Sequence, residues 1–134
     1  MRVDEFMTTR IESIGGDRSV YDAIEKMVDR RIRSLLVTFS EKDSDYGVIT
    51  ARDIVFKVFA KGNNPRDTTV SQIVSKPIVC VDRQADVTEV PSLMAESHIA
   101  RVFVCEDNKI VGVVSLLDLM AASLIIRARG DHVT

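Results

Sequence analysis

The chain has 134 residues, of which 46% are hydrophobic and 28% charged, and its formal net charge is −2. A chain of this length can bury about two-thirds of its unfolded surface, so it needs no metal or disulfide to hold a core. Because the 18 Lys and Arg residues are spread along the chain and form no basic stripe, nucleic-acid binding is not expected.

The apolar segments are too short to cross a membrane. The longest, around residues 120–126, falls well below the ~18 residues that a span requires, and no apolar stretch follows the N-terminus. We therefore expect a cytoplasmic protein with no membrane partner. Cys80 and Cys105 are each flanked by Val, which favours free thiols that act as small buried hydrophobic residues. The histidines, His98 and His132, have no partner at ligand spacing, so no metal site is expected.

In chain order, the hydrophobic periodicity predicts a strand, a helix, a two-stranded hairpin and a closing helix, and then the same series again. The strands are expected at residues 10–14, 34–39, 46–49, 77–81, 101–105 and 110–114. Ser19 and Asp86 are the predicted N-caps of the first helix in each series. Pro91 falls about five residues into the second of these helices, where it should remove an intrahelical hydrogen bond and kink the helix.

The closing helices are predicted to begin at Thr50 and Ser115. Each is expected to bury one apolar face, formed by Ile54, Val55, Val58 and Phe59 in the first helix and by Leu116, Leu119, Met120 and Leu124 in the second. Gly62 is predicted to terminate the first closing helix.

An internal repeat underlies this doubled order. Val20, Met27, Ile32 and Val37 correspond to Val87, Met94, Ile99 and Val104, each 67 positions later. Past a hairpin loop that is two residues longer in the first copy, the offset becomes 65. A constant offset with one small insertion indicates duplication. We assign residues 1–64 to the first repeat, 65–126 to the second, and 127–134 to a flexible tail.

The element order β-α-β-β-α, the pair Met7-Thr8 and the string Gly-Val-Ile-Thr-Ala-Arg-Asp-Ile-Val at residues 47–55 resemble the CBS domain. The second copy repeats the string as Gly-Val-Val-Ser-Leu-Leu-Asp-Leu-Met at residues 112–120. The resemblance covers about residues 1–126 and is to a stand-alone tandem pair, or Bateman module. It implies an α+β (α/β-like) fold of two tandem repeats packed with pseudo-twofold symmetry.

Tandem CBS pairs typically bind AMP, ADP, ATP or S-adenosylmethionine in clefts between the repeats, and they commonly form homodimers. The resemblance therefore implies a regulatory module that senses an adenosyl ligand and signals to an unidentified protein partner. A ligand-free structural dimerisation module is the alternative. Catalysis is not expected, because the motifs contain no nucleophile beside a base and no metal cluster.

Two [S/T]-x-x-D motifs carry the candidate ligand chemistry: Thr50 with Asp53, and Ser115 with Asp118. In the family, the carboxylate accepts hydrogen bonds from ribose hydroxyls, and the adjacent helix N-terminus favours phosphate. The same spacing is also a capping box, which stabilises a helix start without any ligand. Both interpretations stay open, and one hydroxyl can serve both roles.

By the same resemblance, each cleft combines the motif of one repeat with residues of the other. One site would comprise Ser115, Asp118, Thr8, Ile11, Ile32 and Arg33. The other would comprise Thr50, Asp53, Ser75, Ile78, Ile99 and Ala100, with Arg101 next in sequence. Ile32 and Ile99 would enclose the base, or they are ordinary core residues. Arg33 would reach phosphate or is a solvated surface charge, and because its counterpart is Ala100, the two sites are expected to be unequal.

Overall fold

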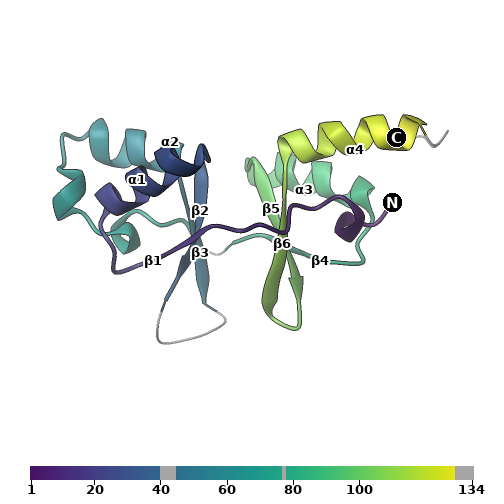
Figure 1. Ribbon diagram of the computed structural model, residues 1–134, viewed down its shortest axis with the longest axis horizontal. Helices are drawn as coiled ribbons and strands as arrows, with labels where there is room; N and C mark the ends of the chain where they lie inside the picture. The colour runs from purple at the N-terminus through teal and green to yellow at the C-terminus, as the bar shows by residue number, and fades with distance from the viewer. Residues whose placement is uncertain (40–44, 77, 129–134) are drawn as a thin grey trace. The chain divides into compact units, whose positions relative to one another are not determined.

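The computed structural model describes residues 1–39, 45–76 and 78–128, which form two compact units (Figure 1). The central unit comprises Ile11–Ile78. The terminal unit comprises Met1–Arg10 and the chain from Val79 onward. These units differ from the sequence repeats assigned to residues 1–64 and 65–126. Each repeat gives its first residues to the unit that is built mainly from the other repeat.

The central unit contains a three-stranded sheet in which β2 lies between β1 and β3. Its elements are β1 (Ser13–Gly15), α1 (Val20–Arg30), β2 (Ser34–Thr38), β3 (Tyr46–Thr50), α2 (Ala51–Ile54), the π-helical turn η2 (Val55–Phe59) and the 3₁₀ turns η3 (Pro65–Asp67) and η4 (Val70–Gln72). β2 runs parallel to β1 and antiparallel to β3. The apolar face of α1 packs against β2, so that Val20, Ala23, Met27, Leu35 and Val37 form part of one buried core.

The terminal unit has the same sheet order, with β5 between β4 and β6. Its elements are η1 (Val3–Glu5), β4 (Cys80–Asp82), the 3₁₀ turn η5 (Val87–Glu89), α3 (Val90–Ser97), β5 (Arg101–Glu106), β6 (Lys109–Ser115) and α4 (Leu116–Ala128). Val3, from the N-terminal segment, is fully buried in a core with Val90, Met94, Val102 and Val104. The two sheets with their helices confirm the predicted mixed α+β fold.

The N-terminal segment is bound to the terminal unit by backbone and side-chain hydrogen bonds. The Val3 amide donates to the Ala85 carbonyl (2.8 Å), and the Asp4 amide donates to the Arg83 carbonyl (3.2 Å). A hydrogen bond from Arg2 is the main cause of a lowered pKa at the Asp4 carboxyl, and Arg83 lowers it further. The first residues of the chain are therefore an integral part of this unit.

The first helix of each series begins at the predicted cap. The Ser19 hydroxyl accepts a hydrogen bond from the Asp22 amide (3.0 Å) at the start of α1. In the second copy, Asp86 caps the 3₁₀ turn η5, and α3 follows with Pro91 in its first turn. The first amides of a helix have no intrahelical partner, so Pro91 costs no hydrogen bond there. The prediction that Pro91 lies inside the helix and removes a hydrogen bond is therefore wrong, because α3 begins only one residue before it.

The predicted buried faces of the closing helices are partly wrong. Ile54 and Val58 are buried, and Leu119 is half-buried. The exposed positions are Val55, Phe59, Leu116, Met120 and Leu124, whereas Ala122 and Ile126 are the buried residues of α4. Since α4 is apolar on nearly all sides, its periodicity does not show which face packs inward.

Other boundaries differ by a few residues. β1 and β4 each begin three residues later than predicted, and Pro77 lies outside the described residues. α4 continues through Arg127 and Ala128, which were assigned to the tail; residues 129–134 and the first hairpin turn at 40–44 also lie outside the described part. Gly62 adopts a left-handed conformation (φ 70°) just past the helix, as predicted. Within the described ranges, no helix is long and apolar enough to cross a membrane.

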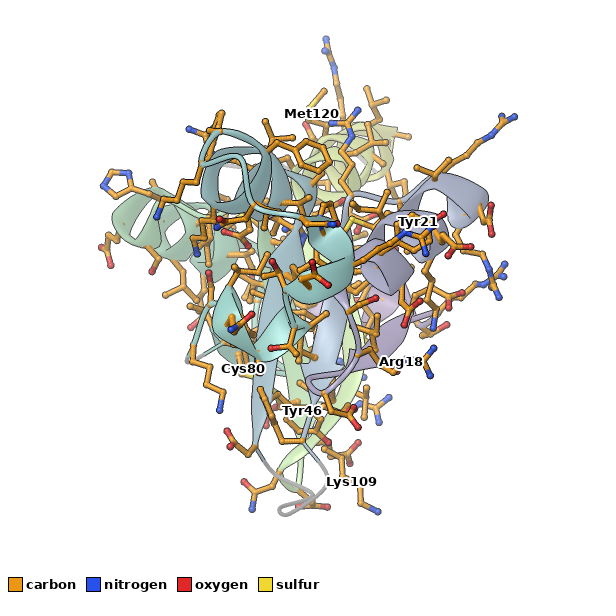
Figure 2. The ribbon with its side chains drawn as sticks, turned by 90° about the vertical axis from the view of Figure 1, so that its left-hand side faces the viewer. Arg18, Tyr21, Tyr46, Cys80, Lys109 and Met120 are labelled. Atoms are coloured by element: carbon orange, nitrogen blue, oxygen red, sulfur yellow. A yellow bond between two sulfur atoms is a disulfide. The ribbon has the colours of Figure 1, made fainter. Side chains whose placement is uncertain are left out.

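The prediction of free, buried thiols is wrong, because Cys80 and Cys105 form a disulfide. Their Cα atoms lie 6.0 Å apart on the neighbouring strands β4 and β5. Cys80, labelled in Figure 2, is exposed, and Cys105 is half-buried. The two residues are 25 positions apart in the sequence and meet only because β4 pairs with β5.

Reduction of this disulfide should destabilise the protein. Closing a loop between residues 25 positions apart restricts the unfolded chain, and the chain-entropy model gives about 3.5 kcal/mol of stabilisation. We expect a reductant to lower the midpoint of guanidinium unfolding followed by circular dichroism. A C80S/C105S double variant should unfold at the reduced midpoint with or without reductant. Equal midpoints for oxidised and reduced wild-type protein would contradict this expectation.

Candidate functional site

Both [S/T]-x-x-D motifs form capping boxes at the start of the closing helices. In the central unit, the Asp53 amide donates to Thr50 Oγ1 (3.0 Å) and the Thr50 amide donates to Asp53 Oδ2 (3.0 Å). In the terminal unit, Asp118 and Ser115 make the same two bonds, at 3.2 and 2.9 Å. The structural role that the sequence allowed is therefore present in both copies.

Each motif lies beside a hydroxyl residue from the opposite repeat. Thr8 pairs with Val113 through two backbone hydrogen bonds of 2.9 Å, immediately before the Ser115 motif. Ser75 pairs with Val48 in the same manner, at 2.9 and 3.1 Å. We call residues Met1–Arg10 and 65–78 the exchanged segments, because each joins the sheet-and-helix unit of the other repeat.

Two buried glycines permit this close approach. A Cβ atom at Gly112 would collide with the Met7 side chain, and one at Gly47 would collide with the Val74 side chain. Glycine is required at both positions because the exchanged segment passes directly over the strand. The internal repeat pairs Gly47 with Gly112, but only the structure gives the reason.

The two aspartates have different neighbours. Thr8 Oγ1 lies 3.3 and 3.4 Å from the carboxylate oxygens of Asp118 and donates to them. Asp53 Oδ1 instead forms an ion pair with Lys57 Nζ (3.2 Å), one helical turn later. At the repeat offset of 65, Ala122 takes the place of Lys57. Among the described residues, Asp53 therefore has a cationic partner that Asp118 lacks.

Lys57 is a site residue that the sequence reasoning missed. Its ammonium also donates to the Ile73 carbonyl (3.2 Å), so it connects α2–η2 to the second exchanged segment. The i,i+4 spacing from Asp53 was a signal for this ion pair, because residues four apart share one helix face.

Arg33 and Ala100 lie beside the start of the closing helix in their own units. The Arg33 carbonyl accepts a hydrogen bond from the Ala51 amide (2.9 Å), and the Ala100 carbonyl accepts one from Leu116 (3.3 Å). Both residues are exposed, and Arg101 is half-buried.

The isoleucines assigned to the base pocket are half-buried. Ile32 packs against the core of the central unit, and Ile99 packs against that of the terminal unit. These contacts show that Ile32 and Ile99 are core residues, which was one of their two predicted roles. The role of the isoleucines in enclosing a base stays a prediction.

Each predicted site draws on both units. Thr8, Ser115 and Asp118 come together in the terminal unit, whereas Ile11, Ile32 and Arg33 belong to the central unit. For the second site, the central unit contains Thr50, Asp53, Ser75 and Ile78, and the terminal unit contains Ile99, Ala100 and Arg101. The structure thus assembles half of each site within one unit, and the combination of the halves stays a prediction.

Comparison with known proteins identifies the family. The CBS-domain family model matches residues 3–60 and 70–125. The chain belongs to the CBS-domain family and carries two CBS domains in tandem. It is similar to the CBS domain-containing protein YhcV of Bacillus subtilis, with 26% identity over 98% of this chain and 92% of that protein.

The chain is also similar to a longer archaeal protein and to a solved cyanobacterial structure. An uncharacterized protein of Methanopyrus kandleri is 35% identical over 71% of this chain, and the match spans 48% of that longer protein. Among solved structures, a hexameric CBS-CP12 protein from bloom-forming cyanobacteria superposes with a TM-score of 0.85 at 31% identity. That match covers 95% of this chain and 73% of the cyanobacterial one.

Alanine at Gly112 should displace the first exchanged segment. The added methyl group collides with Met7, and overpacking of this kind typically costs 1–3 kcal/mol. We expect Gly112→Ala to lower the free energy of unfolding and to accelerate hydrogen exchange at the Thr8 and Val113 amides. Gly47→Ala is the matched control and should instead accelerate exchange at Val48 and Ser75. Unchanged exchange at both pairs would show that glycine is not required for the close approach.

Proposed function

We propose that the protein is a regulatory module that binds AMP, ADP, ATP or S-adenosylmethionine at two sites, each built from both repeats. The observation that carries this proposal is the placement of Thr8 beside Ser115 and Asp118, repeated by Ser75 beside the Thr50 motif. The family membership supports it, because tandem CBS domains are commonly regulatory ligand-binding modules.

The geometry of the aspartates is compatible with a ribose ligand. Asp118 uses Oδ2 to accept from the Ser115 amide, which leaves Oδ1 and the Thr8 hydroxyl for ligand contacts. A carboxylate and a hydroxyl together can bind the two hydroxyls of a ribose by charge-assisted hydrogen bonds. At this site, Arg33 is the proposed phosphate partner and Ile32 the proposed contact of the base.

The two sites are proposed to be unequal for a second reason besides Arg33. Asp53 is neutralised by Lys57, so a ribose there must share the carboxylate with an ammonium group. The Asp118 site is therefore proposed to be the tighter one. Arg101 would serve the phosphate at the Asp53 site.

Signalling requires that the ligand bind two conformations with different affinity. We propose that occupancy changes the arrangement of the two units and that a protein partner detects the change, with no catalytic step. The proposed location is the cytoplasm. Disulfides are rare in a reducing cytosol, so Cys80 and Cys105 would be thiols there unless the bond resists reduction.

We also propose that two copies form a homodimer through the apolar faces of the closing helices. Leu117, Met120 and Leu124 of α4 are 72%, 64% and 70% exposed, and Phe56 and Phe59 of α2–η2 are also exposed. Figure 2 shows Met120 at the outer surface. Apolar residues gathered on one helix mark an interaction surface more often than isolated ones do. The similar cyanobacterial protein is hexameric, which supports association of this chain.

Adenosyl ligands should stabilise the protein. A ligand at 100 times its dissociation constant adds about 2.7 kcal/mol, which corresponds to a rise in Tm of roughly 10 °C for a domain of this size. We expect at least one of AMP, ADP, ATP and S-adenosylmethionine to produce such a shift by differential scanning fluorimetry. Stabilisation by none of the four would contradict the sensor and favour the ligand-free dimerisation module.

Variants of the two aspartates serve as controls for the titration. Asp118→Asn should weaken the tighter site and Asp53→Asn the weaker one, each by roughly tenfold, because a charge-assisted hydrogen bond is lost. Asp29→Asn removes an exposed carboxylate from α1 and should leave both affinities unchanged. Wild-type affinity in both site variants would assign the motifs to helix capping alone.

Self-association should depend on the exposed face of α4. A charge at the centre of an apolar interface opposes its burial, so Leu117→Lys should convert a dimer into a monomer in sedimentation velocity. Val28→Lys is the matched control, since Val28 is 70% exposed on α1. The proposal fails if the wild-type protein sediments as a monomer, or if Val28→Lys dissociates it as fully as Leu117→Lys.

A further inference from the structure

The central unit contains a cavity of about 580 Å³, and of its lining residues only Lys57, the ion-pair partner of Asp53, also belongs to a proposed adenosyl site. It lies between the end of the α2–η2 helix and the second exchanged segment, the teal stretch that follows α2 in Figure 1. Its lining includes Lys57, Lys61, Asn63, Asp67 and Gln72. This volume falls in the range of pockets that hold small metabolites.

Two ammonium groups line one side of this cavity. Lys57 lies in η2, Lys61 lies in the turn that follows it, and both line the cavity. Lys57 is held by Asp53 and by the Ile73 carbonyl, whereas Lys61 makes no ion pair or hydrogen bond within the described residues. An anionic group in the cavity would therefore contact the unneutralised ammonium of Lys61. It would also contact the ammonium of Lys57, which is already fixed in position.

Apart from Ile73, the rest of the lining is polar and carries one negative charge, that of Asp67. The Gln72 side-chain oxygen accepts a hydrogen bond from the Thr69 amide (2.8 Å), which fixes the side chain and leaves its NH₂ group to donate. Asn63 adds a second amide. Asp67 can accept hydrogen bonds from hydroxyl groups but repels a second anionic group.

We propose that this cavity binds a monophosphorylated sugar. The phosphate contacts Lys57 and Lys61, and the sugar hydroxyls bind the amides and Asp67. Asp53 competes with the phosphate for Lys57, because its carboxylate already pairs with the same ammonium group. The cavity site does not depend on the adenosyl sites, and neutralising Asp53 affects the two in opposite directions.

Glucose 6-phosphate is the probe, titrated into the full chain and followed by backbone amide NMR. We expect shifts confined to residues 57–73 and weaker binding of inorganic phosphate and of glucose. Lys61→Gln should reduce the affinity by roughly tenfold, since one charge-assisted contact is lost, and Lys61→Arg should retain most of it. Lys109→Gln, at an exposed lysine of β6, is the matched control and should bind as the wild type does.

The Asp53→Asn variant distinguishes the cavity site from the adenosyl site. It should strengthen glucose 6-phosphate binding several-fold because it releases Lys57, whereas it weakens an adenosyl ligand at the Asp53 site. The proposal is overturned if no amide in residues 57–73 shifts, or if Lys61→Gln and Lys109→Gln weaken binding equally. Inorganic phosphate that binds as tightly as glucose 6-phosphate would overturn the assignment of a sugar.

Discussion

The exchange of N-terminal segments between the two repeats is the constraint on which the rest of the structure depends. Thr8 pairs with Val113, and Ser75 pairs with Val48, each through two backbone hydrogen bonds. Each unit therefore contains residues from both repeats. A chain divided at the repeat boundary would leave each sheet without the segment that covers its last strand, so the duplicated chain is held together by more than its covalent linker.

The two candidate motifs are chemically unequal although the exchange is the same in both repeats. Both exchanged segments deliver a hydroxyl residue to an [S/T]-x-x-D motif. Among the described residues only Thr8 donates to the carboxylate of its motif, whereas Asp53 pairs with Lys57. Ala122 stands at the position equivalent to Lys57 and is buried. The second repeat therefore has a packed apolar residue where the first repeat has a charged one. One substitution between the repeats thus gives one aspartate a counter-ion and leaves the other with a neutral donor.

The sequence predicted those features that depend on local rules. Ser19 and Asp86 were identified as caps because a short polar side chain can satisfy the free amides of a helix start, and the structure confirms both. The disulfide was missed because its geometry depends on the pairing of β4 with β5, which local periodicity does not specify. The prediction of the buried face of α4 was wrong for a related reason. Nearly every position of this helix is apolar, so the surface against which it packs decides which residues are buried.

The candidate site was predicted in part, and the part that was missed is also non-local. The repeat located Thr50, Asp53, Ser115 and Asp118 without any structure, and the family resemblance added Thr8 and Ser75. The role of the paired glycines required knowledge of which segment passes over the strand. The ion pair of Lys57 with Asp53 could have been predicted from their i,i+4 spacing. The second contact of Lys57, with the Ile73 carbonyl, could not, because Ile73 belongs to the exchanged segment.

Helix capping and ligand binding do not compete for the same atoms of the Asp118 motif. The capping box uses Oδ2 of the carboxylate and the Ser115 hydroxyl as acceptors from backbone amides. Within the part of the chain that the structure describes, Oδ1 has only the long contact with Thr8, a hydroxyl that can rotate toward another acceptor. Because the box fixes the side chain before any ligand arrives, a ligand that uses Oδ1 does not have to order it. The capping role is thus compatible with the proposed ribose contact, and a motif that caps a helix is no evidence against a ligand.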